Sequence, residues 1–308
     1  MPHTLPSLLG ALTTEPGRPR LTWYGDGGER IELSGAVLVN WVSKTTNLLV
    51  EEFDAEPGTV VVTDLPPHWR TLVWALATWR AGAHLRVVDD SSGPAADLSG
   101  ADVVVTAAPD RWTTPDGTRP RGTELVAVAL PALARSFGAD LPPGTVDAAS
   151  AVMTYGDQVG YVAPAEDDSP ALTSAGETVS TGELLGWALA TQDGCGPDGA
   201  RVEVTAAPGA GTGSGTVELL ATALATWAGG GSIVVLSAEV AAELAADPAR
   251  AERLRSSERI TWVAPSTGAA RPGHPSGTVP SRHDTDLSGR LRPASRLPTA
   301  PVNSDHHD

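Results

Sequence analysis

Short runs of β-branched residues alternate with segments of helical periodicity between residues 30 and 265. The runs at 59–63, 102–106 and 232–236 are rich in Val, Thr and Ile. Continuous runs of this kind are typical of strands that are buried on both faces of a parallel sheet. The segments between them, such as 217–227, carry apolar side chains at the spacing of one helical face. The sequence therefore predicts an α/β fold with mostly parallel, doubly wound sheets.

Helix starts and single side chains can also be assigned from local patterns. Ser34 precedes an amphipathic segment and is expected to be its N-cap. Lys44 falls off the apolar stripe of that helix and is expected to face solvent. Ser180 and Glu183 have the spacing of a capping box, which predicts a helix that begins at Ser180. Helix-cap or surface roles are expected for the two histidines inside the predicted domain, His68 and His84, and core packing for most of the tryptophans on predicted helices or strands, which are Trp41, Trp74, Trp79, Trp187, Trp227 and Trp262.

The two ends of the chain differ from the alternating region. Residues 1–19 are expected to form an N-terminal extension with a short helix, followed by the α/β domain at 20–265. From 266 to 308 Pro, Gly, Ser, Arg and Asp dominate, so the segment cannot bury enough apolar area to offset its ordering entropy. We expect a disordered tail there. Its His306–His307 pair is not expected to form a metal site, because two histidines on a mobile tail give poorly shaped coordination.

The charge balance narrows the classes of partner. The chain has 37 acidic and 21 basic residues, for a net charge of −16. Such a chain repels nucleic acids and anionic membranes, so neither is expected as a partner. The single cysteine, Cys195, excludes an internal disulfide framework and a cysteine-cluster metal site. No stretch approaches the ~20 apolar residues of a membrane helix, and the first residues lack the basic region of a signal peptide, so a cytoplasmic protein is expected.

A glycine-rich segment at 209–216 lies between a predicted strand and a predicted helix. Backbone N–H groups of such a segment, together with the helix N-terminus, can cradle a phosphate. Gly209, Gly211 and Gly213 are therefore one set of candidate nucleotide-binding residues. The segment has neither the lysine of a G-x-x-x-x-G-K-[ST] loop nor a G-x-G-x-x-G spacing, and a flexible surface loop is the alternative.

The order of elements resembles the opening of the adenylate-forming enzymes, which include acyl-CoA synthetases, luciferases and peptide-synthetase adenylation domains. The resemblance is carried by ELS at 32–34 before an amphipathic helix, EPGTVVV at 56–62, LPP at 65–67, VWALATWRAGA at 73–83, and TVELL through AGGGSIVVL at 216–236. It covers roughly residues 20–265 and implies the fold of the N-terminal subdomains of these enzymes. AMP or ATP is the ligand that it implies.

The family's phosphate loop, [ST]-S-G-[ST]-T-G-x-P-K-G, has its nearest match at residues 173–178. This segment keeps the small residues Thr173, Ser174, Gly176 and Thr178 but has no following Pro or Lys, and Glu177 adds a carboxylate. The later family motifs, Y-G-x-[ST]-E and the aspartate of TGD, are missing from the sequence. Lys44 is the only lysine, so neither family lysine can be supplied. The chain resembles short adenylation-like proteins of unknown function found in high-GC bacteria.

These observations leave three interpretations of function. In the first, the chain is a truncated, catalytically silent domain that binds a small nucleotide or acyl ligand, or a partner protein. In the second, it is an active adenylate-forming enzyme that uses arginines for phosphate contacts or is completed by another polypeptide. In the third, it is an unrelated α/β nucleotide-binding protein that uses the glycine segment at 209–215.

Overall fold

The computed structural model describes residues 1–88, 98–114, 121–191, 196–206 and 212–265. All of them belong to Met1–Ala270, the first of the two units into which the chain divides. The tail predicted at 266–308 lies outside the described residues, as do Gly209 and Gly211.

Seven strands form the larger sheet, in the order β7-β6-β5-β3-β4-β8-β9. Every neighbouring pair is parallel except the antiparallel pair β8–β9. The strands are β3 (Val60–Asp64), β4 (His84–Val87), β5 (Val103–Thr106), β6 (Glu124–Ala127), β7 (Val146–Asp147), β8 (Pro170–Ser174) and β9 (Glu177–Ser180).

Five strands form the second sheet, in the order β12-β10-β11-β1-β2. Only β1 and β2 are antiparallel to each other. The strands are β1 (Pro19–Tyr24), β2 (Arg30–Ser34), β10 (Arg201–Ala206), β11 (Ser232–Ser237) and β12 (Trp262–Val263). β1 from the start of the domain pairs with β11 near its end, so this sheet closes only when both parts of the chain are present.

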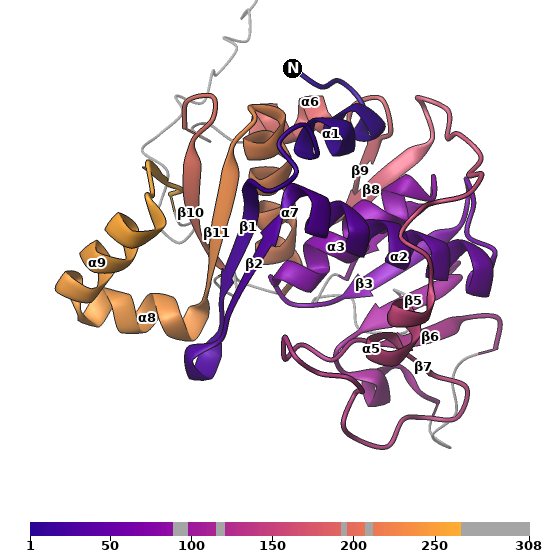
Figure 1. The fold of residues 1–308 in the computed structure, drawn as a ribbon. Coiled ribbons are helices and arrows are strands. Elements are labelled where there is room, and N and C mark those ends of the chain that lie inside the picture. The colour runs from indigo at the N-terminus through magenta and orange to yellow at the C-terminus, as the bar shows by residue number, and fades with distance from the viewer. Residues whose placement is uncertain (89–97, 115–120, 192–195, 207–211, 266–308) are drawn as a thin grey trace, which may run out of the picture. The chain divides into compact units, whose positions relative to one another are not determined.

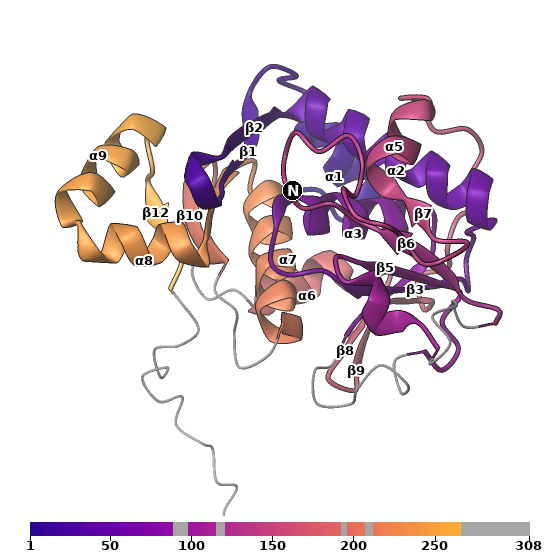
Figure 2. The same cartoon turned by 90° about the horizontal axis from the view of Figure 1, so that it is seen from below.

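Helices separate and cover the two sheets (Figures 1 and 2). They are α1 (Leu5–Leu12), α2 (Gly35–Phe53), α3 (Trp69–Arg80), α5 (Ala148–Ala151), α6 (Leu184–Thr191), α7 (Thr212–Ala228), α8 (Ala238–Ala246) and α9 (Pro248–Glu258), with short 3-10 turns η1 (Asp26–Gly28), η2 (Pro109–Trp112) and η3 (Val152–Thr154). α3 and α7 contact strands of both sheets and therefore lie between them, whereas α8 contacts β10 and β11.

The main hydrophobic core fills the space around α2, α3 and α7. Trp69 and Trp227 are among its largest fully buried side chains. A smaller cluster around Val62 and Trp112 covers the other face of the seven-stranded sheet, and one around Val234 and Leu244 packs α8 and α9 onto the five-stranded sheet. The leucines of α1, which are Leu5, Leu8, Leu9 and Leu12, are buried in the main core. The predicted N-terminal extension thus packs as part of the same unit.

The α/β fold class with mostly parallel sheets is confirmed, and so is the cap at Ser34, whose Oγ accepts from the N–H of Val37 at 3.4 Å. The prediction for Lys44 is wrong. Its ammonium group is half-buried and donates to the carbonyl oxygen of Tyr155 at 2.5 Å, because the 155–158 segment runs over that side of α2. The predicted contact of Ser180 with Glu183 forms, with Oε2 of Glu183 accepting from the N–H of Ser180 at 3.4 Å, but the helix start is wrong, because Ser180 ends β9 and α6 begins at Leu184.

Candidate functional site

The residues matched to the family's phosphate loop form a tight β-hairpin. Thr173 and Ser174 end β8, Thr178 lies in β9, and only Ala175 and Gly176 connect the two strands. Both connecting residues are left-handed, with φ of 50° and 80°. Two consecutive left-handed residues are typical of the tightest hairpin turns, in which the twist of the turn matches that of the strands. The residues matched to the phosphate loop therefore form a closed two-residue turn between paired strands.

The threonine hydroxyls of the hairpin are bonded to each other and to a histidine. Thr173 Oγ1 lies 2.7 Å from Thr178 Oγ1 and 2.8 Å from His84 Nε2. Burial lowers the pKa of His84, and the nearby charge of Arg86 lowers it further, so the ring is neutral at pH 7. Sequence reasoning did not connect these residues, because 89 positions separate His84 from Thr173. Only the parallel pairing of β4 with β8 brings them together.

Gly213, in the described part of the glycine-rich segment, lies against the end of the same strand on the opposite face of the sheet. Gly213 lies in the first turn of α7, and a Cβ atom added to it would stand 2.3 Å from the carbonyl oxygen of Val88, the residue after β4. Three residues on, Thr216 Oγ1 donates to the carbonyl oxygen of Leu65, the residue after β3, at 3.0 Å. The N-terminus of α7 is thus fixed against the carboxyl ends of β3 and β4.

Thr173 and Gly213 therefore both lie near the carboxyl end of β4, but on opposite faces of the sheet. Thr173 shares the face of Arg86 and Val62, whereas α7 packs on the face of Val87. Thr173 is paired with Arg86, only two residues before Val88, and α7 contacts both β4 and β8. In parallel α/β sheets, ligands bind in the crevice outside the carboxyl ends of the strands. The hydroxyls of Thr173 and Thr178 and the neutral imidazole of His84 can offer hydrogen bonds to a ligand. We refer to this region as the carboxyl end of β4.

Other polar groups at the carboxyl ends serve the fold. Asp64 Oδ2 accepts from Trp112 Nε1 at 2.6 Å and from Thr106 Oγ1 at 2.9 Å, which holds η2 against the sheet. His68 is the N-cap of α3, where its Nδ1 accepts from the N–H of Arg70. Burial lowers the pKa of His68 to about 3, with a further contribution from Arg70. His68 is thus a neutral helix cap, in agreement with the sequence-based expectation.

Neither a metal centre nor a membrane helix is found in the part of the chain that the structure describes. Its residues include no group of three His, Cys, Asp or Glu side chains placed to hold a metal ion. None of its helices is both long enough and apolar enough to cross a bilayer.

Comparison with solved structures identifies the fold. An acyl-CoA synthetase from Brucella canis matches 75% of this chain with a TM-score of 0.56 and 19% identity. A fatty acyl-adenylate ligase from L. pneumophila matches 85% with a TM-score of 0.56 and 12% identity, and an N-terminal subdomain from Klebsiella oxytoca matches 85% with a TM-score of 0.54 and 12% identity. The chain spans only 42%, 44% and 60% of these three structures.

The chain therefore has the fold of the N-terminal part of adenylate-forming enzymes. No family model matches the sequence. A curated protein of Mycobacterium tuberculosis, described as a TIGR03089 family protein, is 35% identical over 257 residues, which are 82% of this chain and 93% of the relative. This chain belongs to the TIGR03089 family.

Proposed function

We propose that this chain is a catalytically silent relative of the adenylate-forming enzymes that retains a ligand-binding role at the carboxyl end of β4. The observation that carries the proposal is the two-residue turn at Ala175–Gly176, which lies within residues 173–178, the nearest match to the family's phosphate loop. The fold of the adenylate-forming enzymes is kept, and the residues matched to the phosphate loop form a hairpin that lacks the family's lysine.

Adenylation requires stabilisation of the charge that develops at phosphorus, and preorganised donors supply it. In the hairpin the hydroxyls of Thr173 and Thr178 already bond to each other, and the exposed carboxylate of Glu177 stands next to the turn. Lys44, the only lysine of the chain, lies on α2, where its ammonium group donates to the carbonyl oxygen of Tyr155. By analogy with the removal of one oxyanion donor, loss of the lysine alone would cost on the order of 10²–10³ in rate.

The groups that remain suit a small ligand with few negative charges. They are the hydroxyls of Thr173 and Thr178 and the neutral ring of His84. AMP or an acyl ligand fits this set better than ATP, because each additional phosphate charge needs a compensating cation. A partner protein is the other ligand that we consider for the carboxyl end of β4.

One observation favours the alternative of an active enzyme that uses arginine. Side chains two positions apart on a strand share a face, so Arg86 lies on the same face as His84 and next to Thr173. Its guanidinium donates to the Ser99 carbonyl oxygen at 2.9 Å. An arginine could take the place of the missing lysine if a substrate approached that face.

Carboxylate-dependent exchange of pyrophosphate into ATP separates these two functions. We expect no exchange above a control without protein, with any carboxylate in a broad panel. Clear exchange that is lost in Arg86→Ala but kept in Arg259→Ala, an exposed arginine at the end of α9, would establish the active enzyme.

Binding is tested by titration calorimetry with AMP, ATP and a non-hydrolysable acyl-adenylate analogue. Glu177→Lys should strengthen nucleotide binding severalfold, because it replaces a repulsive charge next to the turn by an attractive one. Glu239→Lys makes the same charge change at an exposed site on α8 and should have a much smaller effect. Wild-type affinity weaker than millimolar for all three ligands would remove the nucleotide from the proposal and leave the partner protein.

A further inference from the structure

Arg70, in the first turn of α3, is a buried cation that forms no ion pair with any other described residue. Arg70 is only 7% exposed, and its Nη2 donates to the carbonyl oxygens of Pro131 and Ala132, both at 3.2 Å. These acceptors are neutral. Charged side chains are almost never buried to this degree unless they are paired, so the charge of Arg70 needs an explanation.

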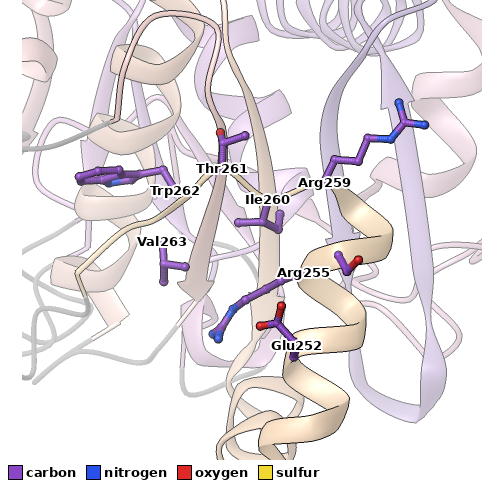
Figure 3. Close-up of a pocket in the computed structure, with 8 residues that line it drawn as sticks. Glu252, Arg255, Arg259, Ile260, Thr261, Trp262 and Val263 are labelled. Atoms are coloured by element: carbon purple, nitrogen blue, oxygen red, sulfur yellow. The ribbon is translucent and has the colours of Figure 1, made fainter.

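Other buried contacts of arginine in the described residues include a carboxylate. Arg20 is 4% exposed and also donates to two carbonyl oxygens, but the carboxylate of Glu15 lies 3.9 Å from its guanidinium. Arg255, which lines a pocket of about 510 Å³ beside β12 (Figure 3), bonds the buried carboxylate of Glu203 at 2.7 and 2.8 Å. Arg70 has the burial of Arg20 without such a counter-ion.

Two N–H groups at the start of α3 also lack an acceptor. The Nε–H of Arg70 and the Nε1–H of Trp69 are buried and form no hydrogen bond with a described residue. The guanidinium carbon of Arg70 lies 4.4 Å from the centre of the Trp69 ring, so the two donors belong to side chains in contact. The ring faces of Trp69 and Trp41 offset part of the positive charge, but they do not accept hydrogen bonds in the plane of the guanidinium. Buried donors of this kind call for an acceptor from outside the described residues.

The electrostatics of this position favour a negatively charged acceptor. Burial lowers the pKa of Arg70 to about 10, and the charge of Glu29 offsets part of this shift, so the guanidinium stays charged at pH 7. Glu29 does not reach ion-pair distance, because its oxygens accept from Nε1 of Trp23 at 2.9 Å and from the N–H of Ala132 at 2.7 Å. An uncompensated buried charge destabilises the fold, and an anion that pairs with it removes that cost.

We propose that Arg70 and Trp69 form a binding site for a small carboxylate, separate from the hairpin groups of Thr173 and His84. A singly charged ligand matches the single guanidinium, whereas a phosphate would bring a second charge that no further cation balances. The two oxygens of a carboxylate can accept from both unpartnered donors, which a halide ion cannot do. The indole faces of Trp41 and Trp69 suit a short apolar body on the ligand.

Thermal unfolding of the full chain, titrated with sodium acetate, tests the site. Because acetate is a very small ligand, a dissociation constant on the order of 1 mM is expected. The thermal midpoint should rise saturably with acetate, since a ligand that binds only the folded chain stabilises it. Sodium chloride at the same ionic strength and acetamide, the neutral analogue of acetate, should give no saturable rise.

Arg70→Gln should weaken the acetate response at least about tenfold. Arg20→Gln is the matched control, because it removes an equally buried arginine that has Glu15 as its counter-ion, and it should change the response less than about twofold. Circular dichroism shows whether each variant is folded. In the wild type, the indole N–H signal of Trp69 in nitrogen-15 NMR, assigned with Trp69→Phe, should shift with the same dissociation constant.

The wild-type measurements decide the question even where Arg70→Gln does not fold. The proposal is overturned by a midpoint that shows no saturable rise up to about 100 mM acetate, or by chloride acting as strongly as acetate. An unchanged acetate response in folded Arg70→Gln, or a Trp69 signal that acetate does not move, would overturn it equally.

Discussion

Glu258, at the end of α9, connects this helix to three strands of the five-stranded sheet, which are β1, β2 and β10. Its side chain is 8% exposed, and its Oε1 accepts from the Tyr24 hydroxyl at 2.6 Å and from Arg30 at 2.8 and 3.1 Å. Its Oε2 accepts from Arg201 at 2.5 Å. Because the apolar cluster under α8 and α9 is small, we expect this carboxylate to be a main attachment of α9 to the sheet.

Glu258→Gln keeps the shape of the side chain but removes the charge. Loss of one partner from a buried ion pair costs about 3–5 kcal/mol. Arg30 is 42% exposed, so solvent screens part of its contribution, and we expect a loss of about 2–3 kcal/mol in the free energy of unfolding. For a unit of this size that loss corresponds to a fall of roughly 4–12 °C in the thermal midpoint.

The assay is thermal and urea unfolding at pH 7.5, with Glu243→Gln as the matched control. Glu243 forms an ion pair with Arg250 at 2.8 Å, but the two side chains are 44% and 50% exposed. An exposed pair of this kind contributes at most about 1 kcal/mol. The distances are alike, so burial is the variable that differs. If Glu258→Gln lowers the midpoint no more than Glu243→Gln does, the reasoning from burial is refuted.

Three further predictions concern pH, the start of α7 and the tail. Burial alone would raise the pKa of Glu258, but hydrogen bonds from Tyr24, Arg201 and Arg30 outweigh burial and lower the pKa to about 2. The ionised carboxylate therefore contributes its full stability above the ordinary pKa near 4.5 and loses it as the pH falls toward 2. The thermal midpoints of wild type and Glu258→Gln should accordingly approach each other between pH 6 and pH 3. Gly213→Ala should lower the thermal midpoint, because its Cβ would collide with the Val88 carbonyl, whereas Gly10→Ala, with open space around its Cβ, should not. Deletion of 266–308 should change the midpoint by less than about 4 °C, and a larger drop would show that the tail packs on the domain.

The sequence determined the fold class because the signal is local. Strands of a parallel sheet are buried on both faces and their helices on one face, which produces valine-rich runs and helical periodicity in the sequence of each segment. Strands such as β3 and β11 were therefore predicted to within a residue or two at each end. The N-cap at Ser34 was recognised for the same reason, since its partner lies three residues away. The match of residues 173–178 to a phosphate loop also came from sequence, by resemblance to known enzymes.

Tertiary structure decided everything that depends on strand pairing. The contact of His84 with Thr173 and the approach of Gly213 to Val88 depend on which elements are neighbours in space. No local sequence pattern determines the order of the strands. The burial of Lys44 was not predicted, because the segment that covers its side of α2 lies more than 100 residues later in the sequence. Trp262 shows the converse. Its strand was predicted, but its exposure follows from the place of that strand at the edge of the sheet, because a side chain is buried only when another element is there to cover it.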